Sequence, residues 1–287
     1  MFRSYATHAE KKNFMSVLST LESLAADKKL KRKPAKYCTT FSRSLGEGFA
    51  ATSFSFKLFP VKANSGVAID FTPSKLTPDG WSLFREMLGT IFHNDPHQIL
   101  SDFKLSKVEI AMDVMVPFDE LLCIAPGVAT ENLNYLAKGT RYLGQKGGKR
   151  TFCIYDKRKQ LADEVAVDLG HDLTRIEVRV RRSGISLSEI AVIDKPFGEL
   201  VAVRKTALSR LIVAHPGDSV LQVFFDHVMA GGSAQGAYLQ LSKHRRKHLL
   251  GRLVRCSLGL NGKSETWGAW IEQQSSQVVA NFTDAKS

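Results

Sequence analysis

Alternation between apolar and polar residues runs through three segments in the middle of the chain, and this pattern is typical of half-buried β-strands. The three segments are residues 107–115, 150–157 and 175–181. Because successive side chains of a strand point to opposite faces, Glu109 and Asp113 share the polar face of the first segment. By the same rule Tyr155 and Lys157 share a face of the second, and Glu177 faces outward from the third. If the strands are neighbours in one sheet, three carboxylates, a phenol and an ammonium converge on one patch.

The rest of the chain predicts a mixed architecture. Apolar residues at helical spacing predict a helix over about residues 8–27, and Thr77 followed by Pro78 and Asp79 is a helix start. Further strands are expected at 53–61, 66–71 and 141–144, whereas Pro117 and Pro126 bracket a loose connection to which the pattern assigns no structure. From about residue 187 onward the pattern is helical. The fold class is therefore α+β: a mainly antiparallel sheet with helices on one face and the polar patch on the other, followed by a mostly helical C-terminal region.

Composition and charge indicate which class of partner the protein binds. The 287 residues are 44% hydrophobic, enough for a sizeable core, and their net charge is +12. Such a charge favours a polyanion, with nucleic acid the first candidate and an anionic membrane surface the second. Two basic runs carry much of it, at residues 28–36 and 243–255. No apolar run approaches the roughly 20 residues of a membrane span, and the first residues lack a signal-peptide pattern, so we expect a cytoplasmic protein without a membrane partner. The four widely spaced cysteines are expected to be reduced thiols rather than a zinc site.

Each of these features also has a structural interpretation. A tyrosine in a strand is often half-buried with its hydroxyl satisfied, and this alternative applies to Tyr155. The acidic residues of the alternating segments can be explained as cross-strand ion pairs with Lys107, Arg175 and Arg179. The two basic runs can be solvated faces. His244 and His248, four positions apart, have the spacing of metal ligands on a helix, but a basic helix that faces DNA is the better account.

Five short blocks, in this order, resemble the rolling-circle replication initiators of the Rep-trans type, which occur on bacterial plasmids, filamentous phages and integrative conjugative elements. The blocks are Val67 to Thr77, Val108 to Asp113, Arg141 to Gly144, Ile154 to Lys157 and Arg175 to Val178. Each block alone is unspecific, and the ordered set over about residues 66–181 carries the resemblance.

The resemblance implies a metal-dependent tyrosine transesterase. Tyr155 falls on the nucleophile of the family's Ile-Tyr-Asx-Lys block, and Glu109, Asp113 and Glu177 fall on its metal ligands. Oxygen ligands of this kind suit Mg²⁺ or Mn²⁺. Several relatives have Asp at the position of Glu109, which is also a hard oxygen ligand. A divalent ion and the neighbouring Lys157 are expected to favour the phenolate and to neutralise the phosphate.

The DNA contacts are expected at two places. Arginines beside the patch are predicted to hold the DNA backbone, and these are Arg150, Arg175 and Arg179. The C-terminal basic run would suit origin recognition, through Lys243, Arg245, Arg246 and Lys247. The corresponding organisation is an N-terminal helix and basic segment over 1–36, a catalytic nicking core over 37–185 and a helical DNA-binding region over 186–287.

The expected function is site-specific nicking and strand transfer of origin DNA in a bacterial cytoplasm. Attack by Tyr155 would leave a 5′-phosphotyrosyl link and a free 3′-hydroxyl, which a host polymerase extends with the help of a host helicase. A homodimer would suit a protein that acts at a paired or hairpin origin. Two alternatives stay open: a relaxase of a conjugative element with the same chemistry, and an origin-binding regulator that does not cleave DNA.

Overall fold

A computed structural model divides the chain into two compact units, and the division falls within strand β6 (Phe103–Val114). The first unit comprises Met1–Glu109, Val180–Asp194 and Gly268–Ser287, and the second comprises Ile110–Arg179 and Lys195–Trp267. The structure describes residues 2–6, 11–34, 38–45, 52–59, 66–72, 76–93, 103–129, 131–132, 139–145, 148–181, 185, 197–198 and 200–260. The core expected over 37–185 is divided between the two units, and most of the region expected to be helical, 186–287, belongs to the second unit.

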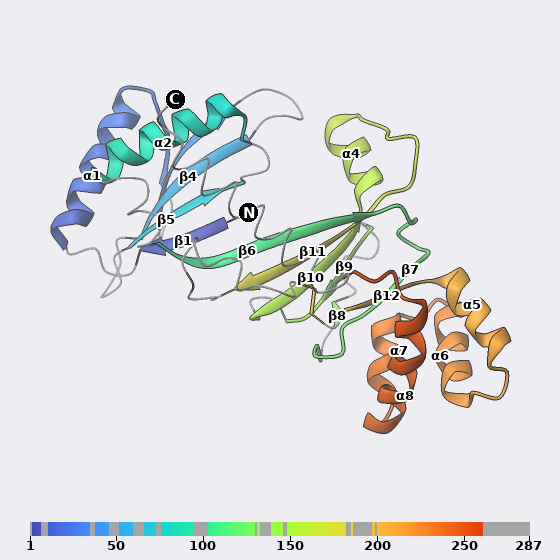
Figure 1. The fold of residues 1–287 in the computed structure, drawn as a ribbon. Helices are drawn as coiled ribbons and strands as arrows, with labels where there is room; N and C mark the ends of the chain where they lie inside the picture. Colours follow the sequence, from blue (N-terminus) through green and yellow to red (C-terminus); the bar gives the residue numbers. More distant parts are fainter. Residues whose placement is uncertain are drawn as a thin grey trace. The chain divides into compact units, whose positions relative to one another are not determined.

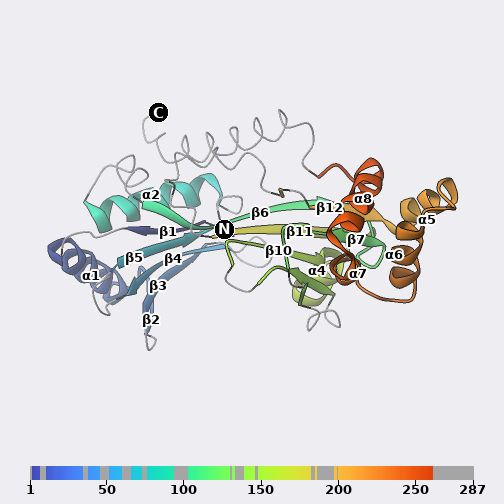
Figure 2. The ribbon, with the colours of Figure 1, turned by 90° about the horizontal axis from the view of Figure 1, so that it is seen from below.

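The first unit contains an antiparallel sheet, in which the strands follow the order β2, β3, β4, β5, β1 and the first part of β6. Figure 2 shows β5, β4, β3 and β2 side by side in this order. The bounds are β1 Phe2–Ala6, β2 Lys31–Pro34, β3 Thr39–Leu45, β4 Thr52–Phe59 and β5 Gly66–Phe71. The basic run after the first helix is therefore partly a strand, since Arg32 is paired with Phe41 while all four β2 side chains remain exposed.

Of the described helices, α1 (Lys11–Ala26) and α2 (Pro78–Phe92) belong to the first unit. Helix α2 begins as the sequence predicted, because the Thr77 hydroxyl accepts a hydrogen bond from the backbone N–H of Gly80 at 3.1 Å. Its Trp81 and Phe84 rings pack on Phe71 of β5, with centroids 6.0 and 4.8 Å away. The helix thus covers the apolar face of the strands.

The second unit contains the last part of β6 and the strands that correspond to the alternating segments 150–157 and 175–181. They follow the order β6, β11, β10, β9 and β8, and β9 pairs with β10 antiparallel so that Tyr155 lies opposite Thr140. Their bounds are β8 Glu131–Asn132, β9 Thr140–Leu143, β10 Arg150–Asp156 and β11 Thr174–Arg181. In β11 the side chains of Ile176 and Val178 are fully buried, and Glu177 between them is on the opposite face.

The helical part of the second unit is built on a two-stranded sheet, β7 (Leu121–Ile124) with β12 (Val201–Arg204), which the sequence pattern did not predict (Figure 1). The helices are α5 Lys205–Ala214, α6 Ser219–Met229, α7 Ala234–Gln240 and α8 Lys243–Leu253, followed by the 3₁₀ turn η5 Val254–Cys256. The fully buried Gln235 amide bonds both the N–H and the C=O of Ala125, at 2.8 and 3.2 Å. These bonds fasten α7 to the end of β7.

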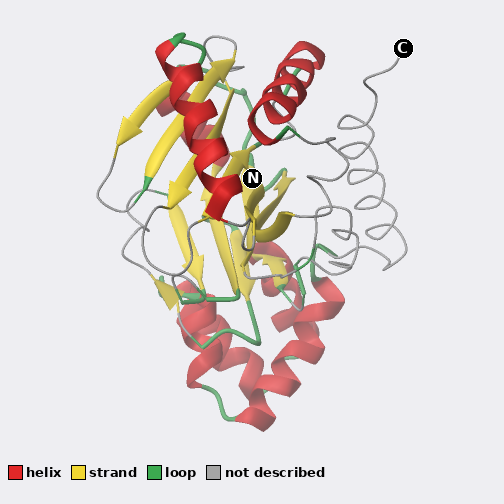
Figure 3. Ribbon diagram, turned by 90° about the vertical axis from the view of Figure 1, so that its left-hand side faces the viewer, coloured by secondary structure: helices red, strands yellow, loops and turns green. Residues whose placement is uncertain are grey.

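The fold class is confirmed as α+β with antiparallel sheets; Figure 3 shows the helices in red and the strands in yellow. The strand predicted over 150–157 was wrong at its last residue. Lys157 does not extend strand β10 but begins helix α4 (Lys157–Val165), because the Asp156 carboxylate accepts the N–H of Lys159 at 2.8 Å and caps the helix. Within the described ranges, no helix combines the length and the apolar character that crossing a bilayer requires.

Candidate functional site

The candidate site lies in the second unit, on the face of the sheet to which Tyr155 and Glu177 project. The Tyr155 hydroxyl donates a hydrogen bond to Oε1 of Glu177 at 2.7 Å. The other carboxylate oxygen of Glu177 accepts a bond of 3.3 Å from the guanidinium of Arg179. The Arg179 guanidinium also lies 5.9 Å from the centre of the Tyr142 ring on β9. The phenol thus has a carboxylate partner, and an arginine and the strand backbone hold that carboxylate in place.

A second pair completes this arrangement. The Arg175 guanidinium binds Asp113 of β6 through two bonds of 2.6 Å, a bidentate geometry that fixes the plane of the fork. Arg175 is also near enough to Tyr155 for its positive charge to favour the ionised phenol. We call these five residues, Asp113, Arg175, Tyr155, Glu177 and Arg179, the Tyr155 network. The sequence grouped them on one face, whereas the influence of Arg175 on Tyr155 was not predicted.

The side chains around the phenol favour its protonated form. Burial raises the pKa of Tyr155 above its ordinary value, and the charge and hydrogen bond of Glu177 raise it further; Arg175 acts in the opposite direction but more weakly. Tyr155 is therefore a neutral hydrogen-bond donor at neutral pH. The hydrogen bonds from Arg175 to Asp113 raise the pKa of the guanidinium, so Arg175 is a permanent cation beside the phenol.

Lys157 is close to the phenol although it is not on the strand. Its Nζ lies 6.0 Å from the centre of the Tyr155 ring. The same ammonium donates a hydrogen bond of 2.8 Å to Gln160, one turn along helix α4. Lys157 therefore lies at the start of a helix next to Tyr155.

The predicted metal ligands are engaged by cations. Glu109, in the first unit, forms an ion pair with Lys107, while Asp113 and Glu177 are bound to Arg175 and Arg179. Among the described residues there is no group of three or more His, Cys, Asp or Glu side chains that could hold a metal ion. The side chains in this arrangement therefore do not form a ligand set for Mg²⁺ or Mn²⁺, and the metal requirement stays a prediction. The structural interpretation of the sequence expected these cations in cross-strand pairs, but only the pair of Arg175 with Asp113 joins two strands, because the other two pairs lie within one strand.

The predicted DNA contacts fall into two groups. Arg150 is exposed at the start of β10, and its guanidinium lies so close to the backbone of Gly198 that a Cβ there would clash. On α8, Lys243, Arg245 and Lys247 are exposed. Arg246 instead serves the fold: its guanidinium donates to the carbonyls of Tyr238 and Leu239 at the end of α7 and lies 5.4 Å from the centre of the Tyr238 ring.

No protein-family model matches the chain, and no curated protein matches it. The family resemblance thus rests on the five sequence blocks alone, and the function has to be argued from the geometry of the site.

Proposed function

We propose that this protein nicks DNA at a specific site and transfers the strand, with Tyr155 as the nucleophile. The observation that carries the proposal is the 2.7 Å hydrogen bond from the Tyr155 hydroxyl to Glu177, with the Arg175 guanidinium beside the same hydroxyl. A nucleophile within hydrogen-bond reach of a base, whose own position is fixed by a third group, is the arrangement on which covalent catalysis relies. Here Arg179 is that third group.

In the proposed reaction, Glu177 acts as the general base. Because the pKa of Tyr155 is raised, the hydroxyl does not lose its proton to water at neutral pH, and the proton has to pass to an acceptor during attack. The phenol oxygen forms a bond to phosphorus while the bond from phosphorus to the 3′ oxygen breaks. The proton passes to Glu177, and the 3′ oxygen takes one from water. The products are a 5′-phosphotyrosyl link and a free 3′-hydroxyl.

Arg175 supplies the positive charge in this scheme. The guanidinium fork matches two oxygens of a phosphate, and its bidentate contact with Asp113 holds the side chain in a fixed plane. A fixed cation beside the reacting oxygen stabilises the charge that develops during attack. Lys157 is the second cation near the phenol and is assigned to the phosphate. No step is assigned to a metal ion.

The substrate in this proposal is the origin of a rolling-circle replicon or the transfer origin of a conjugative element, since both use the same chemistry. The free 3′-hydroxyl implies a host polymerase and helicase as partners. The genes encoded beside this one, for replication or for conjugation, would separate the two.

The test is incubation with a supercoiled plasmid that carries the element's own origin, followed by a denaturing gel for DNA-linked protein. We expect an adduct with the unaltered chain and with Tyr142→Phe, whose hydroxyl is on the neighbouring strand, but none with Tyr155→Phe. An adduct that survives in Tyr155→Phe would contradict the proposal. Parallel reactions with Mg²⁺, with Mn²⁺ and with a chelator test the metal requirement. This test is separate from the test of the nucleophile, which depends on whether Tyr155→Phe still forms the covalent adduct.

A second candidate is an origin-binding regulator that does not cleave. It is supported by the raised pKa of Tyr155 and by the ion pairs that already engage each predicted metal ligand. For a regulator, Tyr155→Phe keeps origin binding and no adduct forms with any variant. For a nickase, Tyr155→Phe keeps origin binding while the unaltered chain forms the adduct.

A further inference from the structure

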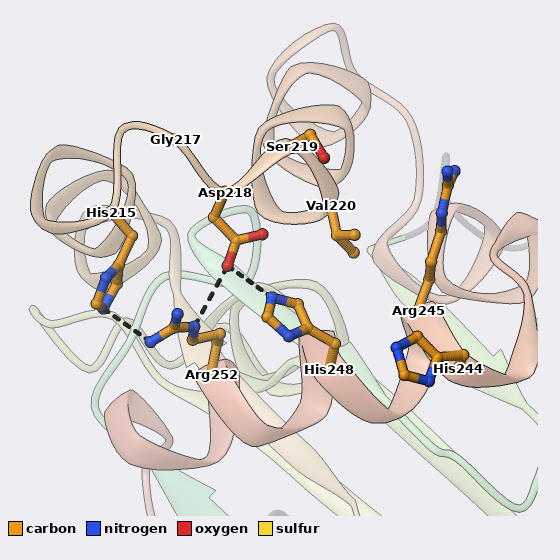
Figure 4. Close-up of a pocket in the computed structure, with 9 residues that line it drawn as sticks. All are labelled: His215, Gly217, Asp218, Ser219, Val220, His244, Arg245, His248 and Arg252. Atoms are coloured by element: carbon orange, nitrogen blue, oxygen red, sulfur yellow. Dashed lines mark hydrogen bonds and ion pairs between the residues drawn. The ribbon is translucent and has the colours of Figure 1, made fainter.

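A pocket of about 580 Å³ opens in the helical part of the second unit, between the turn that joins α5 to α6 and one face of α8 (Figure 4). This is the size range of small-ligand sites. Its lining is unusually rich in basic groups: His215, Gly217, Asp218, Ser219, Val220, His244, Arg245, His248 and Arg252. The four α8 residues in this lining share one side of that helix. We call it the α8 pocket.

A single carboxylate organises the inner end of the pocket. Oδ1 of Asp218 accepts the N–H of Leu221 and caps helix α6 at 3.1 Å. Its Oδ2 binds His248 at 2.7 Å and Arg252 at 3.3 Å, and Arg252 in turn reaches His215 at 3.3 Å. Figure 4 shows this chain of contacts across one side of the pocket. The side chains at this end are therefore held in place by one another.

The outer end of the pocket carries charge without a counter-charge. In the part of the chain that the structure describes, the side chains of Arg245 and His244 have no hydrogen-bond or ion-pair partner. Two guanidiniums and three imidazoles thus share the pocket with one carboxylate, whose oxygens are already engaged. The pocket also includes the first two residues of α6, where the helix dipole is positive.

We propose that the α8 pocket binds a phosphate group. Arginine favours phosphate because its fork donates two parallel hydrogen bonds, and excess positive charge in a recess attracts an anion. The phosphate comes either from a nucleic-acid backbone or from a free phosphate compound, and the chemistry of recognition is the same. The inference goes beyond the proposed nicking reaction, because it depends on no residue of the Tyr155 network.

A metal ion and a purely structural role both fit the α8 pocket less well than phosphate does. A metal ion is disfavoured because the Arg252 guanidinium lies between His215 and Asp218, where it would repel a cation. A structural role accounts for the Asp218 contacts, which join the α5–α6 turn to α8, but it gives no reason for Arg245 and His244 at the same opening. A phosphate ligand would supply the partner that the Arg245 side chain lacks among the described residues.

The experiment compares two charge reversals in the full-length chain, Arg245→Glu in the pocket and Arg210→Glu on the exposed side of α5 as the matched control. All proteins also carry Tyr155→Phe, so that binding is measured without a covalent adduct and independently of nicking. Both arginines are exposed on the surface of a helix, and circular dichroism checks that both variants are folded. The two readouts are melting temperature with inorganic phosphate against chloride at equal ionic strength, and fluorescence anisotropy with a short single-stranded oligonucleotide.

We expect Arg245→Glu to weaken binding roughly ten-fold in at least one readout, and Arg210→Glu to change it by no more than about two-fold. Loss in the oligonucleotide readout alone identifies a DNA backbone phosphate, and loss in the phosphate readout alone identifies a free phosphate compound. Competition between the two probes shows that one pocket takes both. Equal effects of the two variants, or no binding of either probe by the parent, would overturn the proposal.

Discussion

The Tyr155 network and the α8 pocket are both rich in arginine, yet their charges are balanced differently. In the network, two guanidiniums face two carboxylates and a phenol, and each charged group has a partner of the opposite sign or a hydrogen bond. In the pocket, two guanidiniums and three imidazoles face one carboxylate. A balanced set of charges fixes geometry, whereas an unbalanced set attracts a ligand. We therefore assign orientation and chemistry to the first region and anion binding to the second.

This difference also explains why net charge alone says little about where DNA binds. The chain carries +12, but arginines such as Arg175 and Arg246 are used within the fold. Only cations without an internal partner contribute fully to attraction of a polyanion. Single substitutions and pH titrations test this division of roles, and the strongest effect is expected at the proposed base.

The strongest effect is expected from Glu177→Gln, which keeps the shape of the side chain and its acceptor oxygen but removes the base. The rate of adduct formation should fall about 10² to 10⁴-fold, the usual contribution of general-base catalysis. Affinity for an origin oligonucleotide should not weaken, because a negative charge has been removed. Single-turnover kinetics and anisotropy measure the two quantities. The distinction between the two regions breaks down if Glu177→Gln cleaves normally, or if Arg245→Glu lowers the cleavage rate of bound DNA as strongly.

A smaller effect is expected from Asp113→Asn. The amide cannot form the charged bidentate contact, so Arg175 loses its fixed plane beside Tyr155. We expect adduct formation to slow about ten-fold, while the free energy of unfolding changes by less than about 1 kcal/mol because the pair is partly exposed. Quenched time courses measure the rate of adduct formation, and urea unfolding measures the free energy of unfolding. If instead unfolding changed by several kcal/mol with an unaltered rate, Asp113 would be a structural residue only.

In the pocket, Asp218→Ala should affect stability rather than binding. The substitution removes the α6 cap and should lower the free energy of unfolding by about 1 to 2 kcal/mol. Phosphate should bind at least as tightly, since Asp218 is the one carboxylate among the residues that line the pocket. Asp226→Ala, at an exposed position of the same helix, is the control and should change stability by less than about 0.5 kcal/mol. Urea unfolding and the phosphate-dependent melting temperature measure the two effects.

Asp218 also makes the stability of the protein depend on pH. Burial acts to raise the pKa of Asp218, but the hydrogen bond from His248, the N–H of Leu221 and the charges nearby lower it by more, so the net pKa is below its ordinary value. The stability that Asp218 contributes is therefore present above about pH 4, the pKa of an unfolded aspartate, and is lost as the pH falls through the folded value. The unaltered chain and Asp218→Ala should converge in stability in acid. A constant difference down to low pH would show that the carboxylate charge is not involved.

The weakest effect concerns the Tyr155 phenol itself. Its pKa is raised, so it should stay protonated when ordinary tyrosines ionise near pH 10. Because the folded pKa lies above the unfolded one, Tyr155 contributes stability below about pH 10, and this contribution is lost only as the pH rises further, through the folded pKa. Ultraviolet titration of the unaltered chain and of Tyr155→Phe should give superimposable steps near pH 10. An additional step there in the unaltered chain would mean that the phenol is not engaged with Glu177.

Much of the fold followed from local rules. Alternation placed Glu177 opposite the buried Ile176 and Val178, and the hydroxyl of Thr77 set the start of α2, because both depend only on residues close in sequence. The strands β7 and β12 were missed for the opposite reason. They are short, all but Arg204 of their residues are buried, and they pair across some 80 positions, so that no alternation marks them.

The candidate site also combines features set by nearby residues with features set by distant strands. Alternation fixes the face of a strand but not the distance along it: Glu109 and Asp113 are four positions apart, which in an extended strand is about 13 Å. Which cation each acid meets is decided by the neighbouring strands. Lys157 was placed on a strand because the pattern continued, whereas the Asp156 cap turns the chain into a helix at that residue.

The amino-acid sequence alone was enough to predict the α+β class, the faces of the alternating strands and the basic character of residues 243–255. Only the folded chain decided that Tyr155 donates to Glu177, that Arg246 caps a helix and that Asp218 lies against His248, thirty positions away. The reason is the distance along the sequence over which each feature is determined. Side-chain direction and helix capping are set within a few residues, whereas the partner of a charge depends on which distant segments pack together.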